Sequence, residues 1–106
     1  MITYQDWVIS EAKAANSDAC TKALDWNVWC CYEHDLSCLY AKDPRDAYRK
    51  WKESPVDYWC RASYHRRRDA DKRFWRCNRE LDPSAVGKLR SDVRYIGVRI
   101  GALWPF

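Results

Sequence analysis

Glycine and long apolar runs are scarce in this chain of 106 residues. It holds three glycines, none of them in residues 16–29, and no stretch approaches the roughly 18 apolar residues of a membrane-spanning helix. The first 20 residues lack a basic start followed by an apolar run, so they predict no Sec-type signal peptide. No repeat, low-complexity tract or domain boundary is visible. The length predicts a single domain over residues 1–106.

Aromatic residues and cysteines are abundant instead. The hydrophobic fraction of 47% and the aromatic fraction of 15% indicate a folded chain. Seven Trp and seven Tyr suit a dense small core, or else a surface that meets lipid headgroups. Six cysteines predict up to three disulfides, although zinc ligation by reduced thiols is an alternative.

The pattern of apolar residues and turn signals predicts an all-α domain. Helices are expected over residues 1–15, from the cap at residue 25 through 30–40 to about 42, over 44–53 and 63–81, and from 82 onward, with residues 55–63 as an irregular connection. Asp25 is the expected N-cap of the second helix, and Asp43 with Pro44 starts the third. In the last helix Gly97 and Gly101 would let another backbone approach closely. Its apolar residues recur three and four apart: Val86, Leu89, Val93, Ile96 and Ile100.

The candidate chemistry lies on the two long helices, 30–40 and 63–81. His34 is followed by Asp35, and Asp71 lies on the apolar stripe of the other helix. A neutral imidazole paired with a carboxylate is a general base for water, and a calcium ion held by a carboxylate and backbone carbonyls would place positive charge near an ester carbonyl. These residues are therefore the expected base, calcium ligand and orienting partner, provided that the helices pack antiparallel. The simpler alternative for Asp71 is a surface pair with Arg67 or Arg68.

The motifs Cys30-Cys31-x-x-His34-Asp35 and Asp71-x-x-Phe74-x-x-Cys77 resemble the phospholipase A2 superfamily. With the ending Tyr-x-Gly-Val-Arg-x-Gly-Ala, the chain is similar to the small phospholipase A2-like proteins of bacteria and phages. The resemblance covers residues 18–104, with an insertion at 42–63. It implies a small disulfide-braced fold whose two long antiparallel helices carry the site, with His34 and Asp71 catalytic and Asp35 holding Ca²⁺.

The same resemblance implies cross-links and further ligands. Carbonyl ligands for Ca²⁺ would come from Ala19, Thr21 and Ala23, and the Thr21 N–H would join an oxyanion hole. The family has a Tyr where this chain has Cys38, and its calcium loop is rich in Gly. Tyr40 or Tyr64 would replace the missing Tyr. The implied disulfides are Cys20–Cys31, Cys30–Cys77 and Cys38–Cys60.

The function expected from this resemblance is calcium-dependent hydrolysis of a phospholipid ester at a membrane surface. The protein would be virion-associated or exported by a non-Sec route, and otherwise cytoplasmic. One alternative is a non-catalytic virion or assembly protein on the same scaffold, in contact with virion proteins. Another is a basic nucleic-acid-binding module with Zn²⁺ on Cys30, His34, Cys38 and Cys77. No nucleic-acid motif accompanies the basic run that begins at Arg66, so this alternative ranks below a solvated helix face or a membrane contact. The oligomeric state is not indicated by the sequence.

Overall fold

The structure, a computed structural model, describes residues 2–17 and 26–103, with side chains up to residue 101. Within these ranges the chain is all-helical, as predicted, and only an isolated bridge between Lys42 and Tyr64 is strand-like. None of the described helices is long and apolar enough to cross a bilayer. The helices are α1 (Tyr4–Ala14), α2 (Val28–Tyr40), α3 (Pro44–Glu53), α4 (Tyr58–Arg61), α5 (Arg67–Leu81) and α6 (Ala85–Leu103).

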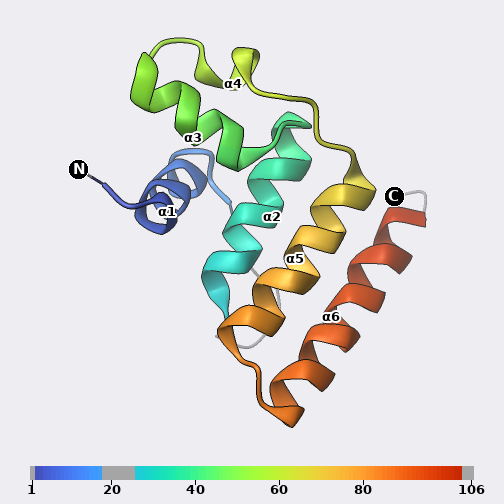
Figure 1. Cartoon of the computed structure of the whole chain (residues 1–106). Helices are drawn as coiled ribbons and strands as arrows, with labels where there is room; N and C mark the ends of the chain where they lie inside the picture. The colour runs from blue at the N-terminus through green and yellow to red at the C-terminus, as the bar shows by residue number, and fades with distance from the viewer. Residues whose placement is uncertain (1, 18–25, 104–106) are drawn as a thin grey trace.

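The helices α2, α5 and α6 lie side by side, and each runs antiparallel to the next (Figure 1). The α1 helix packs against α2. The α3 and α4 helices lie near the C-terminal end of α2 (Figure 1). The predicted pair of long antiparallel helices is therefore α2 with α5, and α5 lies between α2 and α6.

The connection before α5 departs from the prediction. The α5 helix begins at Arg67, not at Ser63, because the preceding backbone pairs with the end of α2. The Asp43 N–H donates to the Ser63 carbonyl at 2.9 Å, and the His65 N–H donates to the Ala41 carbonyl at 2.9 Å. The segment expected to be irregular also contains the short helix α4. As predicted, α3 starts at Pro44, and the Asp43 side chain accepts from the Arg45 N–H.

The α2 helix starts after Asn27, whose φ of 50° places it in the left-handed region. The predicted cap, Asp25, lies outside the described residues.

The aromatic-rich core lies between α1, α2 and α3. Trp7 is 2% exposed, and the rings of Tyr48 and Trp59 lie 5.4 and 5.7 Å from its ring. Burial of this much ring area is a large hydrophobic contribution for so short a chain. The expectation that the aromatic residues fill a small core is confirmed for this end of the molecule. The buried members of the cluster are Trp7, Val8, Ala12, Leu36, Ala47 and Ala62.

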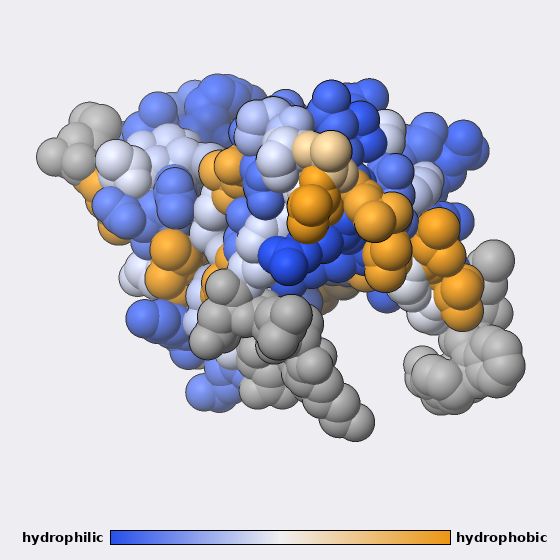
Figure 2. All heavy atoms as spheres, turned by 90° about the horizontal axis from the view of Figure 1, so that it is seen from below, coloured by the Kyte–Doolittle hydropathy of each residue, from blue (hydrophilic) through white to orange (hydrophobic). Residues whose placement is uncertain are grey.

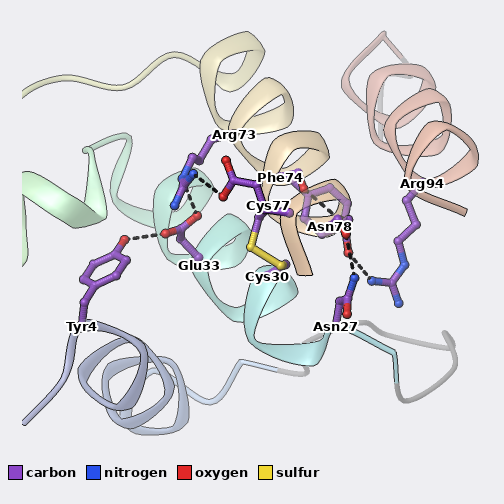
Figure 3. Close-up of a disulfide and its surroundings, with 10 residues drawn as sticks. Tyr4, Asn27, Cys30, Glu33, Arg73, Phe74, Cys77, Asn78 and Arg94 are labelled. Carbon is purple, nitrogen blue, oxygen red and sulfur yellow. Dashed lines mark hydrogen bonds and ion pairs between the residues drawn. A yellow bond between two sulfur atoms is a disulfide. The ribbon is translucent and has the colours of Figure 1, made fainter. Parts of the chain in front are cut away.

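A disulfide fastens α2 to α5. Cys30 and Cys77 are bonded, with their Cα atoms 5.8 Å apart, as the resemblance implied (Figure 3). Both cysteines are buried against Phe74. Cys31 is also disulfide-bonded. Its expected partner, Cys20, lies outside the described residues.

The α6 helix uses a face that the sequence did not indicate. Gly87 and Ser91 are buried against the rest of the fold, whereas the predicted apolar residues from Val86 to Ile100 point outward and are exposed. A Cβ on Gly97 or Gly101 would meet nothing within 4 Å, so the predicted close approach at these glycines is wrong for the described chain. The close approach occurs at Gly87, where a Cβ would lie 2.2 Å from the Asp82 carbonyl oxygen.

This contrast predicts opposite effects for two Gly→Ala substitutions. Gly87→Ala should lower the free energy of unfolding by about 1–3 kcal/mol, because backbone would have to move. Gly97→Ala should raise it by about 0.5–1 kcal/mol, because Ala favours the helix and meets no neighbour. Urea denaturation of both variants measures the free energies of unfolding. An equal change in the two variants would contradict the close packing at Gly87 and the open space at Gly97.

Candidate active site

The centre of the site is a contact between α2 and α5. The His34 Nε2 atom lies 2.6 Å from Asp71 Oδ1. His34 is 9% exposed and Asp71 is fully buried. His34 lies one helical turn beyond Cys30, and Asp71 precedes Cys77 by six residues. The Cys30–Cys77 disulfide therefore fixes the register of the two helices that places His34 opposite Asp71. The structure thus brings together the two residues that the sequence named as base and orienting partner.

Two arginines complete the surroundings of Asp71. Arg99 of α6 donates from Nη1 to Oδ2 at 2.7 Å, and Arg67 donates from Nε to Oδ1 at 3.4 Å. Burial alone would raise the pKa of Asp71, but hydrogen bonds from His34 and Arg99 outweigh it and lower that pKa. Asp71 is therefore an ionised carboxylate that orients the ring. Arg67 had been considered only as a surface partner, and the role of Arg99 was not predicted.

Burial and hydrogen bonding act in opposite directions on His34. Burial disfavours the imidazolium, but the hydrogen bonds to Asp71 and Cys38 raise the His34 pKa to about 9. A raised pKa means that the folded chain binds this proton more tightly than the unfolded one. This contribution to stability is complete below pH 6.5 and is lost as the pH rises through about 9.

Replacing Asp71 with Asn tests this balance. Because the burial of the ring remains while its main partner becomes neutral, the His34 pKa should fall from about 9 toward or below 6.5. An NMR titration of the imidazole protons measures the change. The chain has two histidines, so His65→Gln assigns the signals. An unchanged midpoint in Asp71→Asn would show that Asp71 does not control the ring.

Cys38 is a free thiol beside the same ring nitrogen. Its Sγ lies 3.7 Å from His34 Nε2, and Cys60 is an exposed free thiol on α4. The predicted Cys38–Cys60 disulfide is therefore wrong for this structure, because Cys38 is turned toward His34 and Cys60 toward solvent. Cysteine nucleophiles use one ring nitrogen for the thiol and the other for the carboxylate. Here both partners lie at Nε2, which argues against thiol catalysis.

Two cavities border this part of α2, one of about 260 Å³ beside Asp35 and one of about 240 Å³ beside Cys38. The second is lined by Cys38 together with Tyr64 and His65. Neither Tyr40 nor Tyr64, the expected replacements for the family's Tyr, is among the described hydrogen-bond partners of Asp71. Arg67 and Arg99 occupy that role.

Asp35 of α2 lies next to the residues that follow the end of α1. Its Oδ2 accepts a hydrogen bond from the Ser17 hydroxyl at 2.6 Å. Ser17 directly precedes the segment that carries the expected carbonyl ligands Ala19, Thr21 and Ala23, all of which lie outside the described residues. The Asp35 carboxylate is thus positioned at the start of the proposed calcium loop, and oxygen is the ligand atom that calcium prefers.

A buried ionic network on α2 was not predicted from the sequence. Glu33 is 2% exposed, accepts from the Tyr4 hydroxyl at 2.6 Å, and lies 3.2 Å from Arg73 Nε (Figure 3). Burial raises the pKa of Glu33, although Arg73 and Tyr4 act to lower it. Arg73 follows the basic run that begins at Arg66, for which a solvated helix face was expected. Instead, this network joins α1 and α5 to α2 next to His34, and the only available signal was a Glu beside the His-Asp pair.

The structure contradicts the alternative in which four side chains bind Zn²⁺ in a tetrahedron. Cys30 and Cys77 are bonded to each other, so they cannot ligate a metal. Ligand atoms of His34, Cys38 and Asp71 do lie within 4.8 Å of one another, so this smaller group could hold a metal ion.

Comparison of the chain with family models, curated proteins and solved structures finds no match.

Proposed function

We propose that this protein hydrolyses a phospholipid ester on a phospholipase A2-like scaffold, using His34 to activate water. The observation that carries the proposal is the 2.6 Å contact between His34 and the buried Asp71 across two antiparallel helices joined by a disulfide. The motifs that resemble the superfamily supply the substrate class. The position of Asp35 beside Ser17 supports the calcium assignment.

The chemistry follows from the two ring nitrogens. Because Nε2 faces Asp71, Nδ1 is the atom left to take a proton from water. It can do so only in the neutral imidazole, so hydrolysis should increase as the pH rises toward the His34 pKa of about 9. The water oxygen then bonds to the ester carbonyl carbon, and the same proton passes to the departing alkoxide when the carbon–oxygen bond breaks. Asp71 stabilises the imidazolium formed in between. Calcium bound at Asp35 would supply positive charge near the carbonyl oxygen.

His34→Gln tests the role of the base. Fatty-acid release from mixed anionic phospholipid vesicles by the non-reduced protein should fall by about 10²–10⁴-fold, because the general base is lost. The matched control is His65→Gln, which replaces the other histidine and should retain hydrolysis. Retained release by His34→Gln, with calcium present and abolished by chelator, would contradict the assignment of the base.

Calcium should also stabilise the folded protein. At a free concentration of about 100 times Kd, a ligand that binds only the native state adds about 2.7 kcal/mol to the free energy of unfolding. The melting temperature should therefore rise with calcium, and this rise should vanish in Asp35→Asn. Differential scanning calorimetry with and without chelator measures it.

The second candidate is a non-catalytic virion or assembly protein on this scaffold. The absence of Gly from residues 16–29 favours it, because a loop that turns several carbonyls onto one ion needs conformational freedom. A melting temperature that calcium does not change, together with no lipid hydrolysis, would support this candidate over the enzyme.

A further inference from the structure

The outward face of α6 is an apolar stripe without a described partner. We define the stripe by its five large side chains, which recur three and four residues apart and are each more than half exposed: Val86 59%, Leu89 64%, Val93 61%, Ile96 56% and Ile100 53%. The opposite face carries the buried Gly87 and Ser91. Figure 2, which views the molecule from below, shows hydrophobic side chains gathered where α6 lies. Contiguous exposed apolar surface of this kind marks a binding surface.

The charges beside the stripe are basic. Lys88 and Arg90 flank Leu89 in sequence, so they lie to either side of the stripe, and both are exposed. The one acidic residue of α6 in the sequence is Asp92. It accepts from the Trp75 indole N–H at 2.8 Å and from Arg79 Nη1 at 3.0 Å within the chain. The flanks of the stripe therefore present net positive charge.

These charges help to decide between two possible occupants of the stripe, a second copy of the chain and a lipid surface. A second copy of the chain would offer Lys88 and Arg90 no available carboxylate from its own α6, because Asp92 is already engaged by Arg79. An anionic lipid surface would instead complement both the apolar residues and the flanking cations. We infer that α6 docks on anionic phospholipid membranes, with the apolar stripe in the acyl boundary and Lys88 and Arg90 among the headgroups.

The helix proposed to dock on the membrane is also linked to the proposed active site. Arg99 lies on α6 and donates to Asp71 Oδ2 at 2.7 Å, so the helix that meets the lipid also holds the carboxylate that orients His34. The inference that the membrane supplies the substrate rests on the proposed function. The binding itself does not, because it requires no hydrolysis.

The test measures binding to vesicles of diether phosphatidylglycerol and phosphatidylcholine in chelator, conditions under which no ester can be cleaved. Co-sedimentation gives the partition coefficient. The double variant Val93→Gln/Ile96→Gln should lower it by at least about tenfold. A matched control is Leu39→Gln/Val56→Gln, which replaces apolar side chains that are 62% and 63% exposed elsewhere. It should bind as the wild type does.

A charge variant tests the second part of the inference. Lys88→Glu/Arg90→Glu should weaken binding to anionic vesicles by about tenfold or more. Binding to vesicles of phosphatidylcholine alone should be weak for every variant. Circular dichroism of each variant checks that the fold is retained, which is expected because the replaced side chains are exposed.

Three outcomes would overturn the inference. The first is unchanged vesicle binding by the Val93→Gln/Ile96→Gln variant, and the second is equal loss in the matched control. The third is no binding to anionic vesicles at all, together with a dimer in sedimentation equilibrium that the stripe variant abolishes. That last result would assign the stripe to a second copy of the chain. Hydrolysis without α6 docking would leave the proposed function standing, and docking without hydrolysis would leave this inference standing.

Discussion

The contact between α2 and α5 is the constraint on which the rest of this structure depends. The Cys30–Cys77 disulfide fixes the register of these helices, and that register places His34 2.6 Å from Asp71. Burying an ionised carboxylate is costly unless it is paired and hydrogen-bonded. Asp71 meets that requirement with His34 from one neighbouring helix and Arg99 from the other. The row of three helices is therefore joined at one carboxylate, and Glu33 with Arg73 and Tyr4 forms a second buried polar junction nearby.

Local patterns predicted much of this arrangement. The caps and proline of α3 could be read directly, because they act within a few residues of themselves. The buried face of α5, which includes Asp71 and Cys77, followed from helical periodicity. The pairing of Cys30 with Cys77 came from the resemblance alone, because spacing does not determine which cysteines bond. With that pair in place, the position of His34 opposite Asp71 follows from helix geometry.

The remaining features depend on contacts that periodicity cannot indicate. An apolar stripe identifies one face of a helix but not what covers it, and the recurrence of apolar residues along α6 did not show that they are exposed. The small residues Gly87 and Ser91 are buried instead, and Asp82 approaches the helix closely at Gly87. The ion pairs of Arg99 and Arg73 were not predicted, since their carboxylate partners lie on other helices. Cys38 has no disulfide because its thiol is turned toward His34.

The most direct test of the account is a crystal structure of the non-reduced protein with calcium. We expect one ion bound by the Asp35 carboxylate and by backbone carbonyls of residues 18–25, with His34 Nε2 still on Asp71 and Nδ1 facing a water molecule. A structure in which Asp35 binds no ion at saturating calcium, or in which His34 has turned away from Asp71, would contradict it.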